Sequence, residues 1–507
     1  MLINPSIKRL LLAVHKSKIY AGLIGALLFS QFMLAVASAD IRLPKIFSDH
    51  MVLQRNANVT IWGKAEPQQS LTIRLGDEEI STTADAEGNW TAVVRTGDAG
   101  GPHQLEVAAA KKGEPKIVLS DVMFGEVWLC SGQSNMEWPM TRIDRSEQEI
   151  QTAQNYANIR LFTVGHDASS IPVDDFAKVD SWRTCSPETV KDFSAVAYFF
   201  ARRLSDEMQQ IPIGLIDSSW GGTPAEAWTS RSTLEQLESV RPLLANWAER
   251  NDHRNPHNPS VLFQGMIHPL IQFKLRGVIW YQGESNNGRG AQYSDLFPAL
   301  IADWRSHFKA PEMPFYFVQL APFRYGNRSP LALPEVWDAQ LKTLKNVPHT
   351  GMVVTTDITE LNDIHPKNKQ DVGARLACIA LAKIYLPTPS KESPSDFYSG
   401  PIFRDFTVEG SKIRVDFDYA GEKLQIRAGE ETLTEFQIAA ADGEFVPANA
   451  MIEGNQVLVW SDQVDQPVAV RFGWSDTAQP NLINSAGLPA SPFRTDDFPL
   501  GSHGVYF

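Results

Sequence analysis

Hydrophobic and polar residues change their spacing twice along the chain. From about residue 41 to residue 118, apolar and polar positions alternate in short runs such as "NVTIWGKA", "SLTIRLGD" and "NWTAVVRT", separated by Gly, Pro, Asn and Asp. From about residue 403 the alternation returns, in "KIRVDFDYAG", "KLQIRAGE" and "QVLVWSDQ". Alternation of this kind is typical of half-buried strands. The pattern therefore predicts a β-rich, sandwich-type segment at each end of the chain.

The middle of the chain has a different pattern. From about residue 119 to residue 400, nearly continuous apolar runs alternate with amphipathic stretches of helical spacing. The apolar runs are "EVWLCSG", "IPIGLIDSS", "LRGVIWYQGE", "PFYFVQLAP" and "GMVVTTDI". Strands that are apolar on both faces and separated by helices are typical of a parallel sheet covered by helices. We therefore predict an α/β fold for this region.

The first 39 residues have the features of a secretory signal. Basic residues between positions 8 and 18 precede the apolar run "IYAGLIGALLFSQFMLAVASA", which ends in an A-x-A pattern before Asp40. This order predicts cleavage and export, to the periplasm or the extracellular space. The alternative is an uncleaved anchor, because the apolar run is nearly long enough to span a bilayer.

These patterns divide the 507 residues into four parts. They are a signal peptide (1–39), an N-terminal β-rich segment (40–118), an α/β domain (119–400) and a C-terminal β-rich segment (401–507). The two β-rich segments could be independent modules, or they could pack together as two halves of one sandwich.

Composition narrows the classes of partner. The net charge of -13 argues against nucleic acid or an anionic membrane as the main partner, because both bind basic surfaces. Three cysteines are too few for a disulfide scaffold, although one pair could form after export. The sequence has no C-x-x-C or H-E-x-x-H spacing and no cofactor motif, so we expect neither a metal nor an organic cofactor.

Polar side chains follow four of the predicted strands. In a parallel sheet, ligands bind beyond the carboxyl ends of the strands. Nucleophilic acyl transfer needs a hydroxyl, an imidazole, a group that orients the imidazole, and donors for the oxyanion. The four loops supply all of these groups: Ser131 and Ser134 in "CSGQSNM", Gly221 and Gly222 in "DSSWGGTPAEAW", Gln282, Glu284 and Asn286 in "WYQGESNN", and Asp357, Asp363 and His365 in "TTDITELNDIHP".

These motifs resemble one family of carbohydrate esterases. The segments "GEVWLCSGQSNMEWPM", "GLIDSSWGGTPAEAW", "GVIWYQGESNN" and "DIHPKNKQDVGARLA" are similar to those of the sialate O-acetylesterase family, which are SGNH-type serine hydrolases. The opening "LPKIFSDHMVLQRNANVTIWGKA" and the tail "VRFGWSDTAQPNLINSAGLPASPFRTDDF" extend the resemblance over nearly the whole mature chain. It implies an SGNH-hydrolase-like sheet and hydrolysis of sialic acid O-acetyl esters.

The resemblance also implies roles for single residues. Ser134 matches the nucleophile, with Ser131 as its structural neighbour, and His365 matches the general base. Many SGNH enzymes have an acid three residues before the histidine, but that position is Asn362 here. Asp363 is the preferred acid. Asp357 or a backbone carbonyl are the alternatives.

The oxyanion hole follows from the same resemblance. The backbone N–H of Ser134 and a glycine N–H of the "GGT" turn are the expected backbone donors. Gly221 is preferred there over Gly222. The third donor is expected to be the amide of Gln282, with Asn286 as the alternative.

Aromatic residues flank the motifs and have two interpretations. Trp280 lies inside an apolar strand, which favours a role in the core. Trp138 and Trp220 are the candidates for a wall that binds the sugar. An acidic sugar also needs a cation, for which Arg289 and Arg324 are candidates.

Three other functions stay open at this point. An acetylesterase for plant polysaccharide such as xylan would share the chemistry and differ in its sugar pocket. A non-catalytic carbohydrate-binding protein would need none of the reactive groups. A glycosidase would use Glu284 and Asp363 as a carboxylate pair. We prefer Glu284 as a buried organiser of its loop, because a carboxylate near an oxyanion hole opposes the developing charge.

Overall fold

The computed structural model describes residues 40–110, 116–248, 254–326, 328–386 and 398–505. The predicted signal peptide, residues 1–39, lies outside the described residues. Along the described chain, no helix combines the length and the apolar character needed to cross a bilayer.

The central sheet has the predicted α/β architecture. Its main path runs β13-β12-β11-β7-β10-β8-β9, and every neighbouring pair is parallel except β8 with β9. All residues of β10 to β13 are buried, which explains their continuous apolar sequences. The strands are β7 (Lys116–Gly132), β8 (Ile159–Thr163), β9 (Arg183–Thr184), β10 (Ile213–Ser219), β11 (Gly277–Tyr281), β12 (Phe315–Val318) and β13 (Thr350–Val353).

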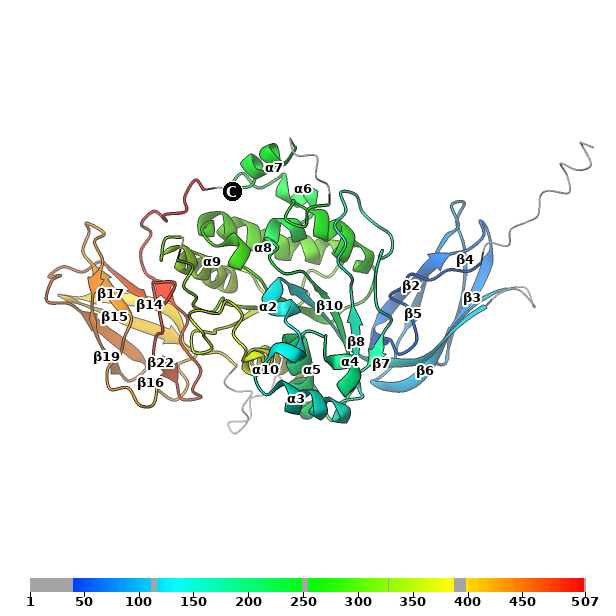
Figure 1. The fold of residues 1–507 in the computed structure, drawn as a ribbon, viewed down its shortest axis with the longest axis horizontal. Helices are drawn as coiled ribbons and strands as arrows, with labels where there is room; N and C mark the ends of the chain where they lie inside the picture. The colour runs from blue at the N-terminus through cyan, green and yellow to red at the C-terminus, as the bar shows by residue number, and fades with distance from the viewer. Residues whose placement is uncertain (1–39, 111–115, 249–253, 327, 387–397, 506–507) are drawn as a thin grey trace, which may run out of the picture.

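Helices cover both faces of this sheet, as predicted. Figure 1 shows α8 and α9 on one side of the sheet and α5 and α10 on the other. The helices are α2 (Ser134–Glu137), α3 (Ser146–Thr152), α4 (Pro187–Val190), α5 (Ala195–Glu207), α6 (Arg231–Leu234), α7 (Arg241–Ala248), α8 (Gly290–His307), α9 (Ala332–Asn346) and α10 (Lys369–Ala380). Shorter 3₁₀ or π turns are η1 (Met140–Arg142), η2 (Ala153–Asn155), η3 (Ala225–Trp228), η4 (Phe263–Ile267), η5 (His268–Leu270), η6 (Glu284–Asn286) and η7 (Leu381–Tyr385).

One long strand joins the N-terminal β-rich segment to the α/β domain. The first part of β7 pairs antiparallel with β6, and the part from Glu126 onward pairs parallel with β10. The partners change at Gly125, where a Cβ would lie 2.0 Å from the carbonyl oxygen of Pro212. The boundary that we predict at residue 118 therefore falls inside a continuous strand. The other strands of this segment are β1 (Val52–Gln54), β2 (Asn58–Lys64), β3 (Ser70–Leu75), β4 (Glu78–Thr83), β5 (Asn89–Arg95) and β6 (Gly100–Ala109).

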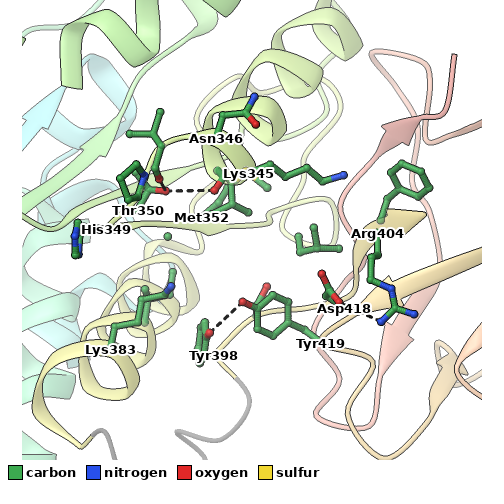
Figure 2. A pocket seen from close by; sticks show the side chains of 18 residues that line it. Lys345, Asn346, His349, Thr350, Met352, Lys383, Tyr398, Arg404, Asp418 and Tyr419 are labelled. Carbon is green, nitrogen blue, oxygen red and sulfur yellow. Dashed lines mark hydrogen bonds and ion pairs between the residues drawn. The ribbon is translucent and has the colours of Figure 1, made fainter. Parts of the chain in front are cut away.

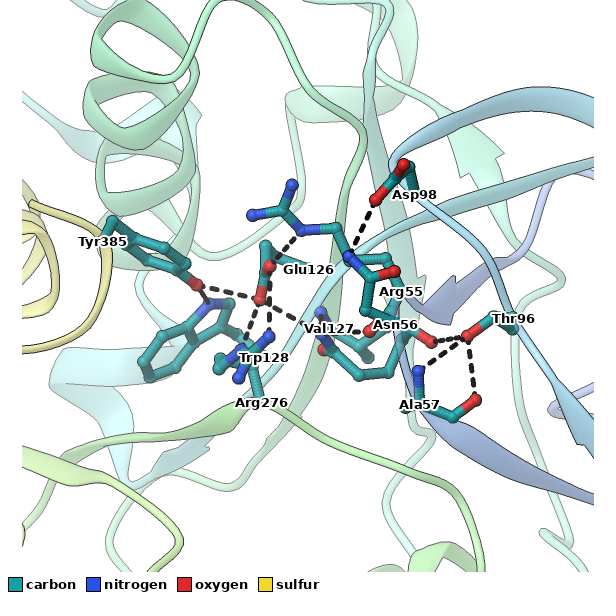
Figure 3. A network of polar contacts seen from close by, with 11 residues as sticks. Arg55, Asn56, Ala57, Thr96, Asp98, Glu126, Val127, Trp128, Arg276 and Tyr385 are labelled. Carbon is teal, nitrogen blue, oxygen red and sulfur yellow. Dashed lines mark hydrogen bonds and ion pairs between the residues drawn. The ribbon is translucent and has the colours of Figure 1, made fainter.

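A buried carboxylate lies at the point where β7 enters the parallel sheet. Figure 3 shows Glu126 between Arg55, Arg276 and Tyr385. The carboxylate is fully buried and accepts bonds from Arg55 Nε at 2.6 Å, Arg276 Nε at 2.6 Å and the Tyr385 hydroxyl at 3.0 Å. Burial alone would raise the pKa of Glu126, but the bonds from the two arginines outweigh it and lower the pKa. The network connects the N-terminal segment, the central sheet and η7.

The C-terminal segment consists of antiparallel sheets. Two of them have four strands each, in the orders β14-β15-β20-β19 and β18-β17-β21-β23, and β16 pairs with β22. Their strands are β14 (Ile402–Glu409), β15 (Lys412–Asp418), β16 (Leu424–Ile426), β17 (Phe436–Ala439), β18 (Val446–Pro447), β19 (Asn449–Glu453), β20 (Gln456–Trp460), β21 (Ala469–Phe472), β22 (Leu482–Asn484) and β23 (Phe493–Arg494).

The two β-rich segments lie at opposite ends of the molecule. Figure 1 shows β2 to β6 on one side of the α/β domain and β14 to β22 on the other. The arrangement differs from a sandwich shared by the two segments, because the α/β domain separates them. The C-terminal segment meets the α/β domain at a pocket of about 580 Å³, in which Tyr398 and Tyr419 lie beside each other (Figure 2). Neither Ser134 nor His365 lines this pocket.

Candidate active site

The nucleophile candidate follows a turn that requires glycine. Gly132 ends β7 with φ +138°, and a Cβ there would lie 2.1 Å from the carbonyl oxygen of Tyr281. The chain then turns into the single-turn helix α2, whose first residue is Ser134. The side-chain oxygen of Gln133 accepts bonds from the N–H groups of Gly283 and Ser285 at 3.3 and 3.2 Å. These bonds fix the nucleophile turn against the loop that follows β11.

The structure brings Ser134 and His365 together. His365 Nε2 lies 2.8 Å from Ser134 Oγ, although 231 positions separate the two residues. The imidazole stacks on Trp138 with a centroid distance of 4.2 Å and an interplanar angle of 14°. Burial, followed by the charge of Lys369, lowers the pKa of His365 below its usual value. The imidazole is therefore neutral at neutral pH and able to accept a proton from the hydroxyl.

The acidic candidates have different partners. Asp363 Oδ1 lies 3.9 Å from His365 Nδ1, which is too long for a hydrogen bond, and the same oxygen accepts the backbone N–H of His365 at 2.9 Å. Asp357 binds Arg375 through both carboxylate oxygens, at 2.8 and 2.6 Å. Asp363 is thus the carboxylate next to the base, and it contacts the backbone of the base.

The glycine of the second loop packs against the serine. A Cβ at Gly221 would lie 3.2 Å from Ser134 Cβ. The Gly221 N–H, however, donates to Glu137 Oε2 at 2.6 Å. The backbone N–H groups of Ser134 and Gly222 have no acceptor among the described residues. The glycine turn therefore has one engaged N–H, at Gly221, and one available N–H, at Gly222, and the N–H of Ser134 is a second available donor.

The side-chain amides of the third loop belong to a buried network. Gln282 Nε2 donates to the Thr223 carbonyl at 3.2 Å and to Asn286 Oδ1 at 2.7 Å, and its own oxygen accepts from the Tyr293 hydroxyl at 3.1 Å. Asn286 also accepts from the Ala225 N–H and donates to a glutamate. These amides support the loops around the site through bonds to the protein.

A pocket of about 380 Å³ opens over the serine and the histidine. Trp138 lines it, whereas Trp220 stacks on His166 with a centroid distance of 4.1 Å. The full lining is Ser134, Glu137, Trp138, Pro139, Arg142, Asp192 and His365.

The cation in this pocket is not one of the two that the sequence suggested. Arg289 is buried in an ion pair with Glu226 at 2.7 Å, and Arg324 donates to Asn362 at 3.4 Å. The pocket instead contains Arg142, whose guanidinium lies 5.3 Å from the ring centroid of Trp138.

Three charged lining residues were missed by the sequence reasoning. Glu137 and Arg142 lie two and seven residues after the "GQSN" motif, so their closeness to the nucleophile in the chain was the available signal. Glu137 Oε1 also lies 2.8 Å from His166 Nε2. Asp192 comes from the segment before α5 and carries no motif.

The remaining candidates do not line the pocket. Ser131 is buried and donates to the Ser218 carbonyl at 2.5 Å. Glu284 accepts from Asn135 Nδ2 at 2.5 Å, does not line the pocket, and has its pKa raised by burial. Trp280 is fully buried in the core. Within the described chain, no three His, Cys, Asp or Glu side chains form a group that could hold a metal ion.

Comparisons with known proteins agree with this architecture. The family described as "Carbohydrate esterase, sialic acid-specific acetylesterase" matches residues 124–382. The sialate O-acetylesterase of Mus musculus is 30% identical over 522 residues, covering 90% of this chain and 94% of the mouse protein. That of Homo sapiens is 31% identical over 517 residues, covering 93% and 96%. A carbohydrate acetylesterase from Xanthomonas citri has a crystal structure with a TM-score of 0.81, 37% identity, and coverage of 90% of this chain and 100% of that one.

The fold and these matches define a carboxylic ester hydrolase. More particularly, the chain belongs to the family of sialic acid-specific acetylesterases among the carbohydrate esterases. The predicted family, the α/β fold class and the enzyme class are therefore confirmed. The result favours an esterase over the non-catalytic binding protein and over the glycosidase.

Proposed function

We propose that the protein is a serine esterase that removes O-acetyl groups from sialic acids through an acetyl-enzyme on Ser134. The observation that carries the mechanism is the distance of 2.8 Å between Ser134 Oγ and His365 Nε2. The family, whose relatives are named sialate O-acetylesterases, supports O-acetyl ester hydrolysis.

In the first half of the reaction, Ser134 Oγ attacks the acetyl carbonyl carbon while His365 Nε2 takes the hydroxyl proton. The negative charge on the carbonyl oxygen is stabilised by the N–H groups of Ser134 and Gly222, because neither has an acceptor in the part of the chain that the structure describes. The Gly221 N–H becomes a third donor when its hydrogen bond to the Glu137 carboxylate breaks. One donor of this kind contributes about 2.7–4 kcal/mol to the transition state.

In the second half, the intermediate collapses and the sugar oxygen leaves. His365 gives its proton to that oxygen, so the sugar departs as a neutral alcohol. Water then attacks the acetyl carbon of the ester on Ser134, with the same imidazole as base, and acetate is released.

The mechanism is tested by p-nitrophenyl acetate hydrolysis and by mass spectrometry of an acetylated enzyme. Ser134→Ala is expected to reduce kcat by about 10⁴-fold or more. Ser131→Ala is the matched control within the same motif and keeps the nucleophile. Equal rates for wild type and Ser134→Ala, or loss of activity in Ser131→Ala alone, would contradict the assignment.

The sugar is assigned from the charge of the pocket. A sialic acid has a carboxylate, and Arg142 is the one cation in the lining, with no carboxylate partner among the described residues. The alternative, acetylated plant polysaccharide such as xylan, is neutral. Glu137 and Asp192 would suit its hydroxyl groups as acceptors.

Acetate release from O-acetylated sialic acid and from acetylated xylo-oligosaccharide distinguishes the two sugars. Arg142→Gln is expected to raise KM for the acetylated sialic acid about 10-fold or more, because a hydrogen bond to a charged group contributes about 1.5–3 kcal/mol. Its rate on p-nitrophenyl acetate should not change. Arg324→Gln, outside the pocket, is the control. Faster release from the xylo-oligosaccharide by wild type would support the alternative.

Export is the remaining part of the proposal. The sequence pattern before Asp40 predicts a cleaved signal and a periplasmic or extracellular protein. Mass spectrometry of the protein purified from its natural source should give a mature N-terminus at Asp40. An intact N-terminus in a membrane fraction would support the anchor instead.

A further inference from the structure

The backbone that carries the base is bound on both sides of one peptide group. The peptide between Ile364 and His365 has a carbonyl oxygen and an N–H. The carbonyl oxygen accepts from Asn135 Nδ2 at 3.0 Å, and the N–H donates to Asp363 Oδ1 at 2.9 Å. By contrast, the ring atom Nδ1 is 3.9 Å from Asp363 Oδ1. Apart from the contact with Ser134 Oγ, the polar contacts that fix the base therefore act on its main chain.

Asn135 connects this peptide directly to the nucleophile, because it follows Ser134 in the chain. Its side chain is 2% exposed and has three partners. Besides the Ile364 carbonyl, Nδ2 donates to Glu284 Oε1 at 2.5 Å, and Oδ1 accepts from Lys369 Nζ at 2.5 Å. A carbonyl oxygen can only accept, so the Ile364 carbonyl requires the amide NH₂ on its side, and the amide oxygen of Asn135 faces Lys369 Nζ. The amide NH₂ then faces the carbonyl next to His365.

Lys369 and Glu284, the two side chains that bind Asn135, are themselves buried. Lys369 is fully buried as the first residue of α10, and its ammonium lies 5.5 Å from the ring centroid of Tyr281. Glu284 lies in η6, after the third strand of the site. The side chain of Asn135 thus links the nucleophile helix, the loop after β11, the histidine loop and the start of α10.

We propose that Asn135 and Asp363 are positioning residues for the base, and that they orient His365 through the Ile364–His365 peptide group instead of through the imidazole ring. In this arrangement Asp363 serves as a hydrogen-bond acceptor, and its charge is not needed to hold the ring. The ring itself is oriented by Ser134 and by the stacked face of Trp138. The inference rests on the proposed serine mechanism.

The Asp363 variants separate the two ways of orienting the base. Asp363→Asn keeps an oxygen that can accept the His365 N–H, whereas Asp363→Ala removes it. We expect Asp363→Asn to keep kcat for p-nitrophenyl acetate within about 10-fold of wild type, and Asp363→Ala to lose about 10²-fold. A carboxylate that acts on the ring, as in a serine triad, would make the Asn variant lose about 10⁴-fold. That result, or equal losses in both variants, would overturn the inference.

The Asn135 variant tests the other side of the peptide. Asn135→Asp is nearly isosteric and keeps the acceptor for Lys369, but it cannot donate to the Ile364 carbonyl. We expect kcat to fall about 10-fold or more while KM stays within about twofold, since substrate contacts are unchanged. Asn362→Ala is the matched control, because Asn362 lies on the same loop, is exposed, and does not contact the peptide. A kcat within twofold of wild type in Asn135→Asp would overturn its part of the proposal.

Two further measurements make the outcomes distinct. Thermal unfolding of each variant shows whether a lower kcat reflects a smaller folded fraction, and a loss fully explained by unfolding counts against positioning. If Asn135→Asp does not fold, the comparison of Asp363→Asn with Asp363→Ala still tests the proposal, because the Asp363 side chain is 38% exposed and its replacement should not prevent folding. Ser134→Ala distinguishes a failure of the serine mechanism from a failure of the positioning proposal. Wild-type rates in that variant contradict the serine mechanism itself, whereas an inactive Ser134→Ala together with unaffected Asn135→Asp contradicts only the positioning.

Discussion

Replacing Glu126 with alanine is expected to weaken the whole molecule while leaving its catalytic groups in place. The fully buried carboxylate accepts bonds from two arginines and Tyr385, and also from Gln54 Nε2 at 3.2 Å. Its removal leaves Arg55 and Arg276 facing each other without a counterion. Breaking a buried ion pair by removing one partner costs about 3–5 kcal/mol of unfolding free energy.

The exposure of the two arginines sets the value within that range. Their side chains are 26% and 33% exposed, so water partly replaces the lost carboxylate and the ionic contribution is about 3 kcal/mol. The lost hydrogen bonds from Gln54 and Tyr385 add about 1 kcal/mol, so the free energy of unfolding should fall by about 4 kcal/mol in total. With a urea dependence of about 3 kcal/mol per M, the unfolding midpoint should fall by roughly 1 M.

Urea unfolding followed by tryptophan fluorescence measures this shift. Glu79→Ala is the control, because Glu79 pairs with Arg74 on the surface with side chains 59% and 49% exposed, and it should leave the midpoint unchanged. The rate of p-nitrophenyl acetate hydrolysis by the folded Glu126→Ala variant should stay near that of wild type. A midpoint equal to wild type would refute the reasoning that Glu126 stabilises the junction of the segments.

Three further predictions concern the site and its surroundings. First, the acid limb of kcat/KM should have its midpoint below pH 6.5, because burial and the charge of Lys369 lower the pKa of His365 and the base must be neutral; a midpoint above 6.5 in the pH profile would contradict this. Second, Trp138→Ala should reduce kcat for p-nitrophenyl acetate about 10-fold, because the stacked ring that orients the imidazole is lost; Trp220→Ala, whose ring stacks on His166, is the control, and equal losses would count against the stacking argument. Third, burial raises the pKa of Asp217 to about 7, so wild type loses stability as pH rises from about 4, the unfolded value, through 7. Asp217→Asn does not have this loss, so its urea midpoint should match wild type near pH 4 and exceed it at pH 8; a midpoint no higher than wild type at pH 8 would show that the buried charge costs nothing.

The sequence predicts those parts of the fold and site that depend on a short stretch of neighbouring residues. The apolar runs and their polar ends identify the strands and the loops, because a strand buried on both faces has no other place in a fold of this kind. Ser134 and His365 are predicted from motifs that resemble those of a known family, and the parallel sheet brings these two motifs to one edge. Trp280 is correctly predicted as a core residue from the apolar strand around it.

The parts that the sequence does not predict depend on which partner a polar group finds. Gln282 and Asn286 have donors suited to an oxyanion, but each is bound within a buried network. In the sequence, Asn135 cannot be distinguished from other asparagines in turns. Its contact with the Ile364 carbonyl, 229 positions away, is visible only in the folded structure. Arg142 is recognised as a pocket residue only when η1 is seen to follow α2. Hydrogen-bond partners that are distant in sequence cannot be read from composition or spacing.

The continuity of β7 limits how the enzyme can be shortened. A catalytic fragment cut at the change of sequence pattern, near residue 119, would remove β6 and leave the first part of β7 as an unpaired strand edge. Met123 and Phe124 would also lose β1, which pairs with them in parallel. An exposed apolar edge of this kind recruits other chains, so such a fragment would aggregate. A soluble minimal enzyme must therefore keep the N-terminal segment, which makes residues 40–118 a folding partner of the catalytic domain rather than a removable accessory.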